Sequence, residues 1–173
     1  MKGFVLGIVF ALALLVAGGW IYLRWGNPAV AVADKAYPFE RQIVRVPLGA
    51  RIAREMNKPP YAGSEDVYVN GAMVYKENCA ACHGVPGEDV AYAQWMYPRA
   101  PQLFKKHAHG NVVGVCDDDP GETYWKVKNG IRLTGMPAFQ HVLSDEDMWD
   151  VTLLLKNADQ PMSAAVTGEL TKK

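Results

Sequence analysis

The heptapeptide NCAACHG, at residues 78–84, constrains this chain more than any other stretch, because it joins Cys79, Cys82 and His83 in one short segment. The 173 residues contain only three cysteines and four histidines. Apart from chance, three explanations are available: covalent attachment of haem, half of a zinc site, or a redox-active dithiol. Each would impose a different fold on the surrounding chain.

Zinc and dithiol chemistry fit the rest of the sequence poorly. Structural zinc needs four ligands, commonly two pairs of Cys or His residues. The remaining thiol, Cys116, has no Cys or His partner close in sequence, and His107 and His109 come nearest. A thioredoxin-type dithiol needs a βαβ surround, and no such alternation of strands and helices is predicted here.

Haem attachment fits best, since Cys-x-x-Cys-His is the pattern that binds c-type haem. Cys79 and Cys82 are three residues apart, so one helical turn presents both sulfurs to the two vinyl groups of one porphyrin. His83 then follows as an axial ligand of the iron. The covalently held haem also supplies apolar surface to a domain of about 110 residues, which is small for a core of its own.

Met136 is the predicted second axial ligand. It stands between Gly135 and Pro137 in a stiff loop, and a thioether is a soft ligand that raises the reduction potential of haem iron in a Met/His pair. Most methionines are core residues. The rival candidates are Met73, Met96, Met148 and Met162.

Three helices are predicted around these ligands. The first follows the N-cap Ser64 and covers EDVYVNGAMVYKENC. The second, GETYWKVKNG, ends at Gly130. The third, LSDEDMWDVTLLLKN, is capped by Ser144 with Asp147 at the capping-box position. No two-residue hairpin turn joins alternating apolar runs, so a hairpin-built sheet is not predicted.

Residues 64–157 resemble class I c-type cytochromes. The resemblance rests on four features in order: a first helix with Gly71-x-x-x-Tyr75, the motif Cys79-x-x-Cys82-His83, the loop Gly135-Met136-Pro137, and a last helix with Trp149 and Leu153. It implies an all-α class I cytochrome c fold, with three to five helices around one covalently bound haem c. In that family the first and last helices cross, which implies contact of Gly71 and Tyr75 with Trp149 and Leu153.

The resemblance also implies a function, the transfer of single electrons between redox partner proteins, with no catalytic residues. Such domains occur in membrane respiratory or dehydrogenase complexes, so a haem-relay subunit of a larger oxidoreductase complex is the alternative. A gas- or peroxide-reactive haem protein is less favoured, because the chain has a single Cys-x-x-Cys-His motif. Haem c is attached on the outer face of the bacterial cytoplasmic membrane, which implies a periplasmic haem domain.

Three further residues are expected in the haem pocket. In the family a proline carbonyl accepts a hydrogen bond from the ligating histidine, and Pro101 is the candidate, with Pro98 and Pro86 as alternatives. Trp125 and Arg132 are candidates for a wall of the pocket and for pairing with a haem propionate. Core packing is the alternative for Trp125.

The remaining chemically reactive residues receive no part in haem binding. His107, His109 and His141 are expected at the surface. Cys116 is expected to be buried or bonded to another chain. Residues 117–119, three consecutive aspartates, are expected to form a solvated loop, with a calcium site as the alternative.

The N-terminal segment predicts a single-pass membrane anchor. Residues 3–23 carry no charge, and at about 1.5 Å per residue they span roughly the 30 Å of the hydrocarbon layer. Trp20, Tyr22 and Trp25 lie at its end, where interfacial aromatic residues belong. A cleaved signal peptide is the alternative, but the apolar run is long for one and no A-x-A cleavage site follows it before Arg24.

The chain therefore divides into four predicted parts: a transmembrane anchor at 1–25, a periplasmic linker arm at 26–63, a cytochrome c domain at 64–160 and a flexible C-terminal tail at 161–173. The arm is expected to hold one short helix that starts at Pro47 and is ended by Pro59. It is either a solvated spacer or a segment that lies along a partner subunit or lipid headgroups.

Charge is unevenly distributed along the chain. Up to residue 61 there are eight basic and three acidic side chains, whereas the remainder is acidic. No basic cluster is interleaved with aromatic residues on the acidic part, so nucleic-acid binding is not predicted. The acidic part is instead expected to attract basic faces of redox partners.

Overall fold

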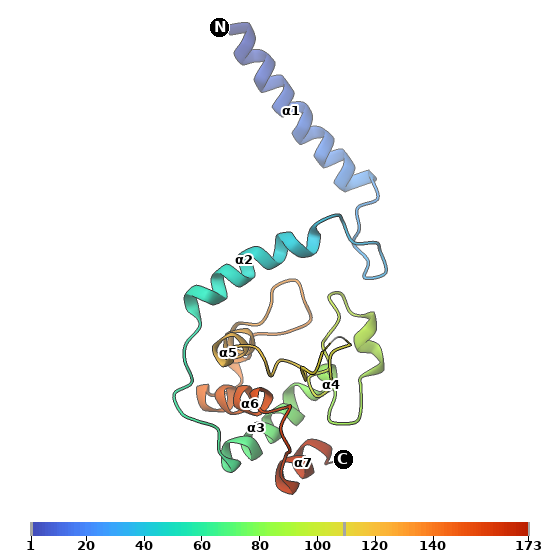
Figure 1. Cartoon of the computed structure of the whole chain (residues 1–173). Helices are drawn as coiled ribbons and strands as arrows, with labels where there is room; N and C mark the ends of the chain where they lie inside the picture. Colours follow the sequence, from blue (N-terminus) through green and yellow to red (C-terminus); the bar gives the residue numbers. More distant parts are fainter. Residues whose placement is uncertain (1, 109, 173) are drawn as a thin grey trace. The chain divides into compact units, whose positions relative to one another are not determined.

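The computed structural model describes residues 2–108 and 110–172, and the chain divides into two compact units, one up to Glu40 and one from Arg41 onward. The elements are helices α1 (Lys2–Trp25), α2 (Glu40–Glu55), α3 (Glu65–Asn78), α4 (Ala80–His83), α5 (Pro120–Asn129), α6 (Asp145–Lys156) and α7 (Ala164–Thr171), with 3-10 helices η1 (Ala91–Trp95) and η2 (Phe139–His141) (Figure 1). The described residues form no strand. The predicted all-α class is thereby confirmed.

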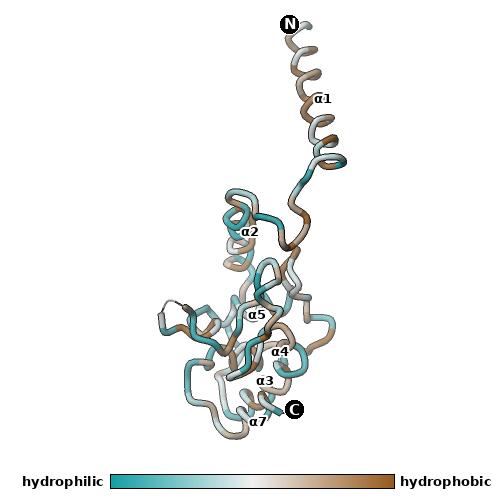
Figure 2. Tube along the Cα trace, turned by 90° about the vertical axis from the view of Figure 1, so that its right-hand side faces the viewer, coloured by the Kyte–Doolittle hydropathy of each residue, from teal (hydrophilic) through white to brown (hydrophobic). Residues whose placement is uncertain are grey.

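Helix α1 dominates the first unit and has the properties of a membrane-spanning helix. It is 24 residues long, its most apolar 18-residue stretch has a mean hydropathy of 2.5, and none of its residues is buried within the chain. Figure 2 shows that it is largely apolar along its length. These properties fit the predicted anchor, although a signal sequence near an N-terminus shares them.

Helices α3 and α6 cross at the centre of the second unit, as predicted (Figure 1). The crossing depends on Gly71, because a Cβ atom added there would lie 2.4 Å from the carbonyl oxygen of Asp150 and 3.1 Å from Cβ of Leu154. The atoms nearest to a side chain at residue 71 thus belong to Asp150 and Leu154, each one residue after the predicted Trp149 and Leu153. Asp150 and Leu154, four residues apart, share the face of α6 that meets α3, and the predicted pair lies about 100° around the helix.

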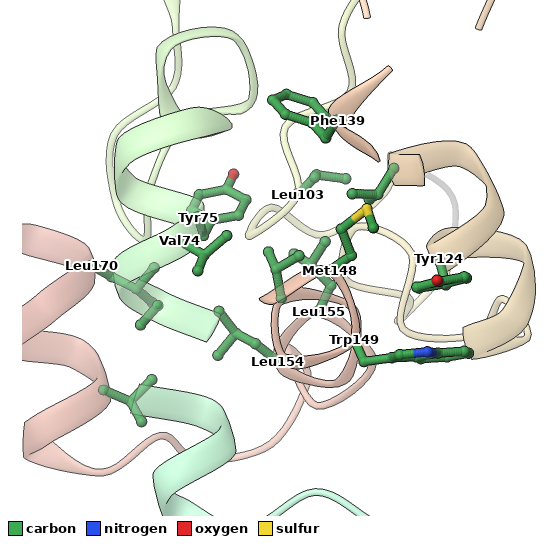
Figure 3. Packing of buried hydrophobic residues seen from close by; sticks show 14 residues of the cluster. Val74, Tyr75, Leu103, Tyr124, Phe139, Met148, Trp149, Leu154, Leu155 and Leu170 are labelled. Carbon is green, nitrogen blue, oxygen red and sulfur yellow. The ribbon is translucent and has the colours of Figure 1, made fainter. Parts of the chain in front are cut away.

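Trp149 faces α5 instead. Its ring stacks on Tyr124 with the centroids 4.0 Å apart and the planes 6° from parallel. Tyr75, the other aromatic residue of the predicted crossing, meets Phe104 edge to face at 5.0 Å and donates a hydrogen bond to the carbonyl of Gly84 at 2.7 Å. Figure 3 shows Tyr75 and Trp149 on different sides of the core.

The three predicted helices of this unit begin and end close to the expected residues. The Ser64 hydroxyl accepts from the backbone N–H of Val67 at the start of α3. Ser144 and Asp147 form a reciprocal capping box on α6, which satisfies two backbone donors at that end. Helix α5 ends at Gly130 as predicted.

The predicted helix in the linker arm is wrong in its extent. Helix α2 starts at Glu40, so Pro47 lies inside it, and it ends at Glu55 rather than at Pro59. The missing N–H of a proline inside a helix leaves the carbonyl four residues earlier without its partner. Here that residue is the exposed Ile43, so water can satisfy its carbonyl.

The predicted flexible tail is also wrong. Residues Ala164–Thr171 form α7, with Ser163 as N-cap, and this helix packs against α3. Val166 and Leu170 are buried, four residues apart on one face. Figure 3 shows Leu170 directed into the core beside Val74. Two apolar side chains at helical spacing therefore anchor this short segment to the core.

Candidate haem site

A single helical turn, α4, carries Cys82 and His83, and Cys79 is its N-cap. The backbone N–H groups of Cys82 and His83 donate to the carbonyl of Cys79 at 3.1 and 3.0 Å. Gly84 ends the turn with φ of 71°, a conformation that favours glycine. The turn thus presents Cys79, Cys82 and His83 from one rigid piece of backbone.

Gln102 fixes this turn to the loop that follows it, a role that no pattern in the sequence predicts. Its amide nitrogen donates to the carbonyl of Cys82 at 3.2 Å, and its amide oxygen accepts from Val90 N–H at 2.8 Å. The next residue, Leu103, donates its N–H to the carbonyl of His83 at 3.1 Å. A single glutamine gives no local pattern that identifies such a contact.

The imidazole of His83 is oriented by the carbonyl of Pro101. The distance from Nδ1 to that oxygen is 2.7 Å, so the hydrogen bond expected from the sequence is present, and it is made to Pro101 rather than to Pro98 or Pro86. With Nδ1 as the donor, Nε2 is left with its lone pair. This is the arrangement in which a histidine binds a metal through Nε2.

The titration of these groups favours an iron ligand over a reactive dithiol. Burial raises the pKa of the Cys79 thiol to about 12, with a smaller contribution from Cys82. A protonated thiol is a poor nucleophile and a poor metal ligand. Burial lowers the pKa of His83, and the hydrogen bond to Pro101 opposes that shift. The neutral imidazole is the form that coordinates metals.

Met136 lies in a short loop that its own hydrogen bonds hold closed. The backbone N–H of Met136 donates to the hydroxyl of Thr134 at 3.1 Å, and that hydroxyl donates to the carbonyl of Ile131 at 2.7 Å. The Ile131 N–H in turn donates to the carbonyl of Met136 at 3.3 Å. Met136 and Cys79 are partly buried against the same hydrophobic core. Thr134 was not predicted from the sequence.

The other methionines differ in how well they could replace Met136 as the candidate axial ligand. Met148 is buried with 1% of its surface exposed, and Met73 is 41% exposed on α3. Met162 packs partly buried against the core. Met96 ends close to the loop that carries Met136, since a Cβ atom added to Gly135 would lie 2.9 Å from the Met96 methyl group. Met96 is therefore the rival that a test must address.

The two predicted wall residues have different surroundings. Trp125 is buried, and its indole Nε1 donates to the carboxylate of Glu55 at 2.9 Å. Arg51 lies over the same ring, 5.7 Å from its centroid. Trp125 thus joins α5 to α2, which agrees with the alternative expectation that it is a packing residue. Arg132 is exposed, and its pairing with a propionate stays a prediction.

The remaining candidates give no second metal site. No group of three or more His, Cys, Asp and Glu side chains suited to a metal occurs within residues 2–108 and 110–172. The calcium alternative at residues 117–119 is not supported, because Asp119 caps α5 and Asp118 pairs with Lys126 at 3.3 Å. Cys116 is a free, partly buried thiol. His107 and His141 are exposed as predicted, and His109 lies outside the described residues.

The helical fold and the cysteine–histidine turn together define a c-type cytochrome, an electron-transfer protein with covalently bound haem c. The model of the family described as "Cytochrome C oxidase, cbb3-type, subunit III" matches residues 67–154, just over half of the chain. The chain therefore belongs to this family. None of the curated proteins compared with it matches.

Proposed function

We propose that the chain is a membrane-anchored carrier of single electrons with one haem c. In this proposal Cys79 and Cys82 form the two thioether bonds, and His83 and Met136 are the axial ligands of the iron. The observation that carries it is the 2.7 Å contact between His83 Nδ1 and the Pro101 carbonyl, because it leaves Nε2 available from a turn that also presents both thiols. Haem c, when bound, supplies the ferric–ferrous couple.

The protein contributes orientation, burial and ligand choice. The Pro101 carbonyl holds the imidazole in one tautomer and one rotation. Thr134 holds the backbone of the Met136 loop. The thioether is therefore kept in position by a short loop. Two protein ligands leave no open position for a substrate, which supports electron transfer over chemistry on a bound molecule.

We further propose that α1 spans the bacterial cytoplasmic membrane, that residues 26–173 lie in the periplasm, and that the protein serves a respiratory chain. Haem attachment outside the cytoplasm supports this orientation. The family description names a subunit of an oxidase, which favours the second candidate function, a haem-relay subunit within a larger oxidoreductase complex. Purification in mild detergent with identification of co-migrating subunits separates a relay subunit from a free-standing carrier.

Met136→Ala tests the ligand assignment. Its haem should stay covalently attached, its ferrous form should bind carbon monoxide, and its reduction potential should fall because the thioether is lost. Met96→Ala is the matched control and should change neither property. If Met136→Ala keeps the low-spin spectrum and the potential, the assignment is wrong. If the changes appear in Met96→Ala instead, Met96 is the ligand.

A further inference from the structure

Helix α2 has an apolar face that no described residue covers. Ile43, Val46, Pro47 and Ala50 follow the spacing i, i+3, i+4 and i+7, so they share one side of the helix. All four are exposed, Ile43 by 67% and Val46 by 71%. We call these four residues the α2 stripe. An exposed apolar stripe on a helix indicates an interaction surface.

The other side of α2 is already occupied. Ile52 lies nine residues after Ile43, about two and a half turns, and therefore on the opposite side. It is only 4% exposed. Glu55 accepts the hydrogen bond from Trp125, and Arg51 lies over the same ring. These contacts hold α2 against α5, so the α2 stripe cannot turn inward.

Within the first unit, the segment after α1 is held by hydrogen bonds up to Glu40, the last residue of that unit. Tyr22 belongs to the last turn of α1, and its hydroxyl lies 3.2 Å from the hydroxyl of Tyr37. The N–H of Ala29 donates to the Tyr37 hydroxyl at 2.8 Å, and the N–H of Tyr37 donates to the carboxylate of Glu40 at 2.9 Å. Glu40 is the first residue of α2. The connecting segment is thus folded back rather than extended.

We propose that the α2 stripe lies in the lipid–water interface of the membrane that α1 spans, an inference that rests on the proposed anchor. The end of a membrane-spanning helix is at the headgroup level, and the chain is folded back between that end and Glu40, so the chain enters α2 within a short reach of the headgroups. Phe39, 71% exposed immediately before α2, adds an aromatic side chain of the kind found in that layer.

Charge along α2 complements phospholipid phosphates. Arg41, Arg45 and Arg54 are exposed, and no ion pair that the described residues form engages them. By helical spacing Arg41 and Arg45 lie on the side opposite the α2 stripe, and Arg54 lies one turn beyond Ala50 on the stripe's own side. A helix with an apolar side and arginines on its polar side is held at the interface with its apolar side roughly 5–10 Å into the headgroup boundary. Since α2 is also joined to α5, this contact confines the haem domain to the membrane surface.

The test uses the full chain with its haem in phosphatidylcholine–phosphatidylglycerol vesicles. A nitroxide is attached to Val46→Cys, or to Thr167→Cys on the exposed side of α7 as a control, each in a Cys116→Ser background. Collision of the label with oxygen reports exposure to lipid. Collision with a water-soluble nickel chelate reports exposure to water. The oxygen-to-nickel ratio should be severalfold higher at position 46 than at 167, and adding Ile43→Asp should lower it.

Two results at position 46 would overturn the proposal. Free access of the nickel chelate means that the α2 stripe faces water. Protection from both reagents means that a protein, either a partner or a second copy, covers it. An alkaline carbonate wash separates this proposal from the anchor. If the wash removes the chain from the vesicles, the anchor and the α2 contact are both contradicted. If the chain stays bound but the label at position 46 is open to the nickel chelate, or protected from both reagents, the α2 contact alone is contradicted.

Discussion

The crossing of α3 and α6 and the segments that carry the proposed iron ligands are built in opposite ways. At the crossing, the protein completes its own packing: Asp150 is 4% exposed, and its carboxylate accepts from Tyr61 at 2.7 Å and from Asn70 at 2.8 Å. The ligand segments contain a four-residue turn and a loop. Their apolar side chains, including Met136, are only partly buried.

This difference separates what holds the fold from what holds the cofactor. The crossing depends on shape, since a backbone carbonyl lies where the side chain of residue 71 would begin. The ligand segments depend on a few directed hydrogen bonds that set the positions of His83 and Met136. Changes at the crossing should therefore alter stability, and changes in the loop should alter ligation.

Gly71→Ala should give the largest effect on stability. The added Cβ would meet the Asp150 carbonyl at 2.4 Å, so α3 and α6 must separate, and such overpacking costs about 1–3 kcal/mol. Gly168→Ala in α7 is the matched control, because a Cβ there meets nothing within 4 Å. That variant should gain up to about 1 kcal/mol from helix propensity. Thermal unfolding of both variants measures the contrast. A change of the same sign in the unfolding free energy of both variants would contradict it.

Thr134→Val should have a smaller effect, confined to ligation. It removes the hydroxyl that bonds Met136 N–H and the Ile131 carbonyl, a loss of about 1 kcal/mol. Exogenous imidazole should then displace the sixth ligand roughly fivefold more readily, with little change in unfolding temperature. Thr134→Ser keeps the hydroxyl and should behave like the parent. If Thr134→Val binds exogenous imidazole with the same affinity as the parent, the Thr134 hydrogen bonds do not support the loop.

The smallest effect is expected in the acid stability of α6. Hydrogen bonds from Ser144 lower the pKa of Asp147, with a further contribution from Asn70. A lowered folded-state pKa stabilises the fold above the unfolded value, about 3.9, and this stabilisation is lost as the pH falls below that value and through the lower folded-state pKa. Asp147→Asn should flatten the pH dependence of unfolding in this range. Asp159→Asn, on an exposed residue after α6, should leave it unchanged.

Sequence patterns predicted the helices that have strong local signals. Ser64, Ser144 and Gly130 sit at helix ends because their side chains or backbone conformations satisfy terminal groups locally. The motif at residues 79–83 required only counting along one helical turn. These predictions needed no knowledge of distant contacts.

The predictions that depended on distant contacts were less accurate. The α6 residues nearest to Gly71 are each one position after the predicted Trp149 and Leu153, because the rotation of α6 about its axis is set by the whole interface. Pro47 was taken as a helix start, although a solvent-exposed helix tolerates it inside. The contacts of Gln102 and of Trp125 with Glu55 join residues that no local pattern links. The ligand roles of His83 and Met136 remain predictions.

Intact-mass spectrometry of the native full-length protein, after denaturation, tests the central claim most directly. Covalent attachment predicts the mass of the polypeptide plus one haem, and the added mass should map to the peptide that contains Cys79 and Cys82. It should disappear in the Cys79→Ser/Cys82→Ser variant. A bare polypeptide in the native protein, or an adduct that survives that double substitution, would contradict the account.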